Sequence, residues 1–297
     1  MNSPFLSKCR KYIIDYFKKN KQILHIINIF LSPKSDIIFL TFKKISDTIT
    51  HWKGCVKMKW SENIKVKFHE TDQNEVASVS QTFKYIQEAA MCQLNEQHPS
   101  YKELLEQGKA FILSSIRLEM SAPIYAYDEI IARSWACPSR GLNFLRSYEI
   151  ERDGEIICEA VSSWALVSIN DKRLLPVEDI DTSAYYTDEV VQTERPVRVR
   201  IPSALPMSLV GEYTVQRSDI DMNNHVNNTN YPRIICDKIP NASKIRIKSI
   251  GIHFANEAVL DETLKIYMSS IDDRIYFRTI KEDGKTNIDA ELIIEKM

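Results

Sequence analysis

The chain has 297 residues, of which 44% are apolar and 27% charged, and its formal net charge is −1. This composition is typical of a globular protein and excludes the collagen-like and low-complexity classes. No apolar run approaches the ~20 residues that a membrane-spanning helix needs, so no stable membrane span is expected.

The first part of the chain, residues 1–57, differs from the rest in charge. It carries a net charge of +8, against −9 for residues 58–297. Because the basic part is short and the body is acidic, nucleic-acid binding is not expected. The segment lacks a small-residue cleavage site and the Arg/Ser bias of transit peptides. We interpret it as a leader upstream of a start at Met58, with its translation left open and a basic membrane-contacting segment as the alternative.

The six cysteines are scattered along the chain and form no Cys-x-x-Cys pair. This spacing indicates neither a zinc site nor a disulfide framework. Free thiols are typical of intracellular proteins, so a cytoplasmic location is expected.

In the first half of the body, apolar and polar residues alternate over 64–68 and predict a strand. A helix is predicted over 80–96. Four of its apolar residues recur at spacings of three and four and form one face: Phe83, Ile86, Ala90 and Leu94. A strand-like run over 115–119 follows, and Asp-Gly at 153–154 predicts a hairpin turn.

An irregular stretch over 171–206, with several prolines, predicts a linker between two domains, 58–170 and 207–297. In the second domain a short strand at 213–215 precedes a polar stretch and a helix over about 227–238. Pro232 falls in the first turn of that helix, where proline is tolerated.

The same features recur in both halves in the same order. Thr71-Asp72 lies 147 residues before Ser218-Asp219, and 115–119 is similar to 249–253. A second Asp-Gly turn at 283–284 matches the first. We therefore predict an α+β fold built from two similar units, each with a helix packed on an antiparallel sheet.

The densest polar cluster of the chain covers residues 218–228, between a predicted strand and a predicted helix N-terminus, where negative charge can be stabilised. It offers a carboxylate, an amide and an imidazole at alternate positions: Asp221, Asn223 and His225. In an extended segment these side chains point the same way. An amide suits an oxyanion and an imidazole moves protons near neutral pH, so the set suits acyl transfer to water. The alternative is a set of turn and cap residues.

Comparison of the two halves favours the catalytic interpretation. At the offset of 147, the first half has Asn74, Val76 and Ser78 in place of the three polar residues. A purely structural cap has less reason to differ so completely between the halves.

The run from Asp221 to Asn228, followed by Tyr231, is similar to the motif Asp-x-Asn-x-His-Val-Asn-Asn of the acyl-acyl-carrier-protein thioesterases. This family comprises plant plastid enzymes and bacterial relatives, and the resemblance covers about residues 60–297. Further residues also resemble family positions: Trp135, Arg146, Trp164 and 172–174. The resemblance implies tandem hot-dog domains, each a helix wrapped by an antiparallel sheet, with acyl-chain binding in the first and catalysis in the second.

Carried over by position, the resemblance implies four catalytic residues: Asp221, Asn223, His225 and Glu257. The next family position is often Cys, but here it is Ala258, so a Cys–His nucleophile is not implied. Water activated by a carboxylate and His225, or attack by Asp221, remain as options. No metal or organic cofactor is implied.

The implied reaction is hydrolysis of fatty acyl-acyl carrier protein to free fatty acid and holo carrier protein, which ends fatty acid synthesis. The implied partner is therefore acyl carrier protein. Two alternatives are an acyl-CoA thioesterase and a non-catalytic acyl-binding hot-dog protein. A hot-dog dehydratase is disfavoured by the residues that follow His225. Chain-length preference and a possible homodimer stay open.

Overall fold

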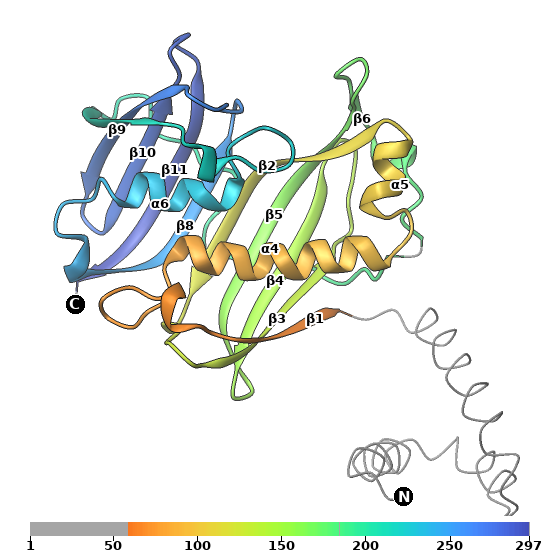
Figure 1. Ribbon diagram of the computed structural model, residues 1–297, viewed down its shortest axis with the longest axis horizontal. Coiled ribbons are helices and arrows are strands. Elements are labelled where there is room, and N and C mark those ends of the chain that lie inside the picture. Colours follow the sequence, from red (N-terminus) through yellow and green to blue (C-terminus); the bar gives the residue numbers. More distant parts are fainter. Residues whose placement is uncertain (1–58, 184, 297) are drawn as a thin grey trace, which may run out of the picture. The chain divides into compact units, whose positions relative to one another are not determined.

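The structure is a computed structural model that describes residues 59–183 and 185–296 (Figure 1). The leader predicted over 1–57 therefore lies outside the described residues. Within the described part of the chain, no helix is long and apolar enough to cross a lipid bilayer.

One antiparallel sheet runs through both halves, in the order β1-β3-β4-β5-β2-β8-β11-β10-β9-β7, with β6 paired to β5. The first half contributes β1 (Trp60–Lys65), β2 (Lys109–Met120), β3 (Glu129–Ala136), β4 (Phe144–Arg152), β5 (Glu155–Ser168) and β6 (Leu174–Leu175). The second half contributes β7 (Ser208–Thr214), β8 (Ile245–Phe254), β9 (Thr263–Ile271), β10 (Arg274–Ile280) and β11 (Thr286–Lys296). The second half repeats the order of the first in reverse, which confirms the predicted tandem of α+β units.

The helix α4 (Val79–Glu96) forms as predicted, because Ser78 caps it by accepting a hydrogen bond from the Gln81 N–H and its four predicted apolar residues are buried. The helix of the second half is shorter than predicted. A 3₁₀ turn, η4 (Asn228–Asn230), takes its first part, and α6 (Tyr231–Cys236) follows with Pro232 in its first turn.

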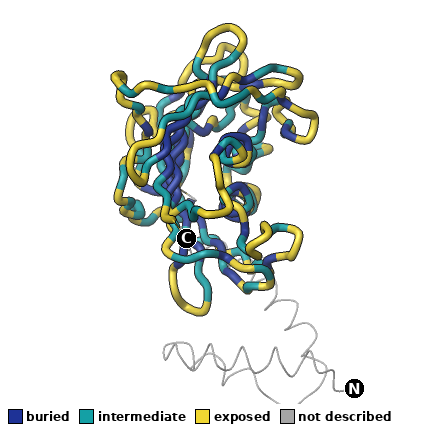
Figure 2. The backbone as a smooth tube through the Cα atoms, turned by 90° about the vertical axis from the view of Figure 1, so that its left-hand side faces the viewer, coloured by how far each residue is buried: buried dark blue, intermediate teal, exposed yellow. Residues whose placement is uncertain are grey.

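Both helices lie on the same face of the sheet (Figures 1 and 2). Figure 2 shows that the buried residues concentrate where the sheet faces them. One continuous apolar core includes residues of both helices and of strands from both halves. A second apolar cluster is formed by the first half and the start of the linker, near α5 (Tyr101–Glu106): Leu94, Leu104, Phe144, Leu166, Leu175, Ile180 and Tyr185.

The two halves meet where β2 pairs with β8, and there Arg117 stands directly opposite Gly251. These two positions also correspond in the sequence repeat, because 115–119 matches 249–253. The equivalent positions of a duplicated strand therefore face each other at the centre of the sheet. A Cβ atom on Gly251 would lie 2.4 Å from the guanidinium carbon of Arg117, so one strand supplies the large side chain and the other supplies the space for it.

Arg117 is 1% exposed, and an ion pair fixes its guanidinium group. Its Nη2 donates to Glu291 Oε2 at 2.8 Å, and Arg195 Nη2 donates to the other oxygen of that carboxylate at 2.7 Å. Burial of Glu291 favours its neutral form, but the two guanidinium groups outweigh this and keep the pKa of the carboxyl below its usual value. The network joins the first half, the second half and the predicted linker.

The predicted linker packs against the sheet over much of its length. Ile116 and Leu118 are buried in the core, so Arg117 between them points to the opposite face of the sheet, where it donates to Pro196 O. Trp135, on β3, also contacts the linker, because its Nε1 donates to Glu189 O at 2.9 Å. The linker therefore helps to hold the two halves in one sheet.

We expect Gly251→Ala to lower the free energy of unfolding by about 2 kcal/mol, because overpacking a rigid site costs about this much. Arg117 cannot withdraw without leaving Glu291 partly unpaired. Urea denaturation of Gly251→Ala, Arg117→Met and the double variant measures the effect. The double variant should lose less stability than the sum of the single losses, and strictly additive losses would show that the two side chains do not compete for space.

Candidate active site

A tight loop carries three of the predicted catalytic residues. Asp221 N–H donates to His225 O at 2.9 Å, and Asn224 N–H donates to Asp221 O at 3.1 Å. Asn224 has a φ of 63°, a left-handed conformation that Asn adopts more readily than most residues and that reverses the chain. The expectation that Asp221, Asn223 and His225 alternate along an extended segment is therefore wrong.

The cluster leads into a helical segment as predicted, but the first turn of that segment is 3₁₀. The helix α6 begins at Tyr231, and the intervening turn η4 is capped by Asn227, whose Oδ1 accepts from the Thr229 N–H. Asp221 has a local role in the loop, since its Oδ1 accepts a hydrogen bond from the Asn223 N–H at 2.8 Å. Its other carboxylate oxygen has no hydrogen bond from any described residue.

His225 and Glu257 come together from separate loops. His225 Nε2 lies 3.0 Å from Glu257 Oε2, with side-chain exposures of 34% and 54%. The backbone joins the two loops directly, because Val226 N–H donates to Ala258 O at 2.9 Å. This bond fixes the imidazole and the carboxylate next to each other at a solvent-accessible position.

Buried amide groups support the loop that bears Glu257. Asn287 is fully buried, and its Nδ2 donates to Asn256 O at 2.6 Å and to the Tyr231 hydroxyl at 2.9 Å. Its backbone carbonyl accepts from the Ala255 N–H. Asn287 was not predicted from the sequence, because it lies on β11 in an ordinary alternating strand.

The first half also contributes to this region. The Tyr101 hydroxyl on α5 donates to Asn223 Oδ1 at 3.3 Å. Tyr101 was also not predicted, because 122 residues separate it from its partner and only the tertiary fold brings them together.

A loop of the same conformation occurs in the first half. Asp72 N–H donates to Val76 O at 2.9 Å, Asn74 N–H donates to Asp72 Oδ1 at 2.8 Å, and Glu75 has a φ of 62°. These bonds match Asp72, Asn74 and Val76 with the three predicted residues of the second half. The comparison of the halves at an offset of 147 is therefore two residues out of register.

The corrected register changes what distinguishes the halves. The aspartate and the asparagine are present in both loops, and only the histidine is replaced, by Val76. The bond from Ala77 N–H to Ile124 O corresponds to the bond from Val226 N–H to Ala258 O in the second half. Pro123 therefore occupies the position in the first half that is equivalent to Glu257. The imidazole–carboxylate pair is thus the specific feature of the second half, whereas the aspartate builds the loop in both.

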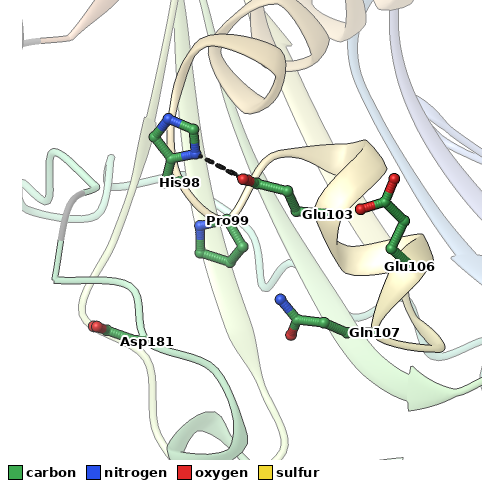
Figure 3. Close-up of a pocket in the computed structure, with 6 residues that line it drawn as sticks. All are labelled: His98, Pro99, Glu103, Glu106, Gln107 and Asp181. Atoms are coloured by element: carbon green, nitrogen blue, oxygen red, sulfur yellow. Dashed lines mark hydrogen bonds and ion pairs between the residues drawn. The ribbon is translucent and has the colours of Figure 1, made fainter.

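A pocket of about 430 Å³ lies away from the predicted residues (Figure 3). It is lined by α5 and the linker, through His98, Pro99, Glu103, Glu106, Gln107 and Asp181. Such a carboxylate-rich lining does not suit a fatty chain. Among the described residues, no group of three or more His, Cys, Asp and Glu side chains is arranged to hold a metal ion.

The described cysteines lack the electrostatic environment of a thiol nucleophile. Burial raises the pKa of the Cys236 thiol to about 12, and burial together with nearby carboxylates raises that of Cys92 to about 11. Burial also raises the pKa of Cys137 and Cys158. A thiol with a raised pKa carries little thiolate at neutral pH and reacts slowly.

The chain matches two models that together describe one family. Residues 57–185 match the acyl-ACP thioesterase N-terminal domain, and residues 203–295 match the acyl-ACP thioesterase C-terminal domain.

Curated relatives match at low identity. A chloroplastic palmitoyl-acyl carrier protein thioesterase of Gossypium hirsutum is 21% identical over 69% of this chain and 54% of its own length. The protein of the same description from Arabidopsis thaliana is 22% identical over 81% of this chain and 63% of its own length. The chain therefore spans less than two thirds of the length of these relatives.

Solved structures show the same fold. An acyl-ACP thioesterase from Bacteroides thetaiotaomicron has a TM-score of 0.73 at 20% identity, covering 79% of this chain and 97% of the other. A 12:0-ACP thioesterase from Umbellularia californica has a TM-score of 0.71 at 15% identity, covering 80% and 98%. These likenesses confirm the tandem hot-dog architecture.

We expect the described thiols to resist alkylation. In a Cys9→Ser/Cys55→Ser variant, which leaves only the described cysteines, iodoacetamide at pH 7.5 should label the native protein at least ~100-fold more slowly than a free cysteine. Intact-mass spectrometry measures the labelling, and the same protein in urea is the control. Rapid labelling of one thiol in the native protein would contradict the assignment of these cysteines as unreactive.

Proposed function

Since the chain belongs to the acyl-acyl-carrier-protein thioesterase family, we propose that it hydrolyses fatty acyl thioesters of acyl carrier protein. The products are the free fatty acid and the holo carrier protein. The observation that carries this proposal is the contact of 3.0 Å between His225 and Glu257 in the second half only.

In the proposed mechanism, His225 is the base that activates water. In the neutral imidazole with the hydrogen on Nε2, the Nε2–H group donates a hydrogen bond to Glu257, and Nδ1 can accept a proton. Water then gives its proton to Nδ1 while its oxygen attacks the thioester carbonyl carbon. Glu257 stabilises the imidazolium that forms.

The carbonyl oxygen becomes negatively charged as water adds, and the Asn223 amide is the proposed donor to it. The tetrahedral intermediate then collapses, the carbon–sulfur bond breaks, and the thiolate takes the proton from the imidazolium. The products are a carboxylic acid and the free thiol of the carrier, so atoms and charges balance. No cofactor is required.

We assign Asp221 the role of shaping the loop. Its Oδ1 accepts the Asn223 N–H, which fixes the residue whose amide faces the substrate. Asp72 makes the same bond in the first half, where neither a histidine nor a glutamate accompanies it. This repetition supports a role in building the loop and does not support direct attack by the carboxylate.

The acyl chain is proposed to bind in the first half. The apolar cluster beside α5 supports this, because Tyr101 packs against the cluster and its hydroxyl reaches the loop that carries Asn223. The four described cysteines are free thiols, which supports the proposed cytoplasmic location. A homodimer stays a prediction, to be tested by light scattering.

Fatty acid release from a series of acyl carrier protein thioesters, with eight to eighteen acyl carbons, tests the function. The matching coenzyme A thioesters are assayed in parallel, with His225→Asn as the inactive control. We expect turnover on the carrier-protein series, with a preferred chain length, and a loss of about 100-fold or more in the control. Turnover on coenzyme A esters alone would identify an acyl-CoA thioesterase. No release from either series would favour a non-catalytic acyl-binding protein.

Two substitutions of Asp221 separate its possible roles. Asp221→Asn keeps an oxygen that can accept the Asn223 N–H, so we expect kcat to stay within about tenfold of the original. Asp221→Ala removes this bond and should lower kcat by about 100-fold or more. Circular dichroism spectra of both variants serve as the folding control. Equal and complete loss of activity in both variants would assign the chemistry to the carboxylate itself.

A further inference from the structure

We propose that Tyr101, on a helix of the first half, is a positioning residue that orients the Asn223 amide toward the substrate carbonyl. This inference rests on the proposed function and adds a residue to it. The two side chains come from opposite halves of the chain, and the hydrogen bond between them is 3.3 Å long.

The bond decides which end of the amide faces the substrate. A side-chain amide has an oxygen that accepts and a nitrogen that donates, and only the nitrogen can stabilise an oxyanion. When the Tyr101 hydroxyl donates to Oδ1, Nδ2 points elsewhere, and no described residue accepts a hydrogen bond from it. Asn223 is exposed, so without the hydroxyl its amide would rotate between both orientations.

The helix that carries Tyr101 is anchored firmly. Ser100 and Glu103 form a reciprocal cap at its start, with the Ser100 N–H donating to Glu103 Oε2 at 2.7 Å. That backbone bond, together with His98, lowers the pKa of Glu103 to about 2, so the cap persists at neutral pH. The His98–Glu103 pair is visible in Figure 3.

Two buried contacts complete the anchor. Leu104 is 1% exposed and inserts into the second apolar cluster. The Tyr185 hydroxyl, from the linker, donates to Pro99 O at 2.7 Å, immediately before the helix. Tyr101 therefore projects from a short helix that is fixed at its start and along its buried side.

The two halves differ at this point in the fold. In the first half, α5 lies between α4 and β2, and it reaches the loop that carries Asn223 and His225. Among the described residues of the second half, only the 3₁₀ turn η5 (Ala242–Lys244) lies between α6 and β8. No hydrogen bond to the Asn74 side chain is found within 59–183 and 185–296. In the described part of the chain, a helix such as α5 is thus present at the Asp221 loop, which has the histidine, and not at the Asp72 loop, which lacks it.

The test compares Tyr101→Phe in two backgrounds. The phenyl ring keeps the apolar contacts, so KM should stay unchanged, whereas loss of the hydroxyl should lower kcat about three- to tenfold. In an Asn223→Ala background the same substitution should change kcat less than about 1.5-fold, because the group it positions is gone. Tyr127→Phe is the matched control, since Tyr127 is exposed and lies in the first-half loop region; it should leave kcat unchanged.

A second readout does not depend on activity. The ¹H–¹⁵N resonances of the Asn223 side-chain amide are identified by their loss in Asn223→Ala. Tyr101→Phe should shift them, and Tyr127→Phe should not. Unchanged kcat in Tyr101→Phe, or an equal fall in both backgrounds, would overturn the positioning role. If the original protein hydrolyses no thioester, the proposed function fails separately, and absence of a shift in the amide resonances would then overturn the contact.

Discussion

The arrangement depends on how β2 and β8 pair at the centre of the sheet. Duplication brings equivalent positions face to face there, and two large side chains cannot occupy the same space. Arg117 and Gly251 resolve the conflict, with a Cβ on the glycine excluded at 2.4 Å. Glu291 and Arg195 then hold the buried guanidinium, which ties both halves and the linker together. Because the halves form one sheet, a helix of the first can reach a loop of the second.

Two loops of one conformation serve different purposes in the two halves. Asp72 and Asp221 each accept a backbone N–H two residues further on, which supports the proposal that the aspartate shapes the loop. The difference lies in the pair His225 and Glu257, which the first half replaces with Val76 and Pro123. The first-half loop has the shared conformation only, whereas in the second half the same conformation is accompanied by an imidazole and a carboxylate. The apolar cluster beside α5 supports the proposal that the first half binds the acyl chain.

The sequence predicted regular elements well and the site less completely. The spacing of Phe83 and Ile86 defined α4, because one apolar face of a helix has a clear period. The loop was misjudged because its chain reversal depends on the left-handed conformation of Asn224, which leaves no periodic signal. The second half has two aspartates, Asp219 and Asp221, where the first half has only Asp72, and pairing Asp72 with Asp219 gave a register two residues away from the correct one. Glu257 followed only from the family resemblance, and Tyr101 could not be predicted, because its contact exists only in the folded chain.

In the proposed complex, the reacting carbonyl binds beside the loop that carries His225, and the acyl chain lies in the first half. A crystal structure of the protein with a non-hydrolysable acyl-pantetheine ketone tests this most directly. We expect the ketone oxygen within hydrogen-bond distance of Asn223 Nδ2, the carbonyl carbon facing His225, and the alkyl chain in the apolar cluster beside α5. A ketone bound at the Asp72 loop, or in the pocket lined by His98 and Glu103 (Figure 3), would show that this placement is wrong.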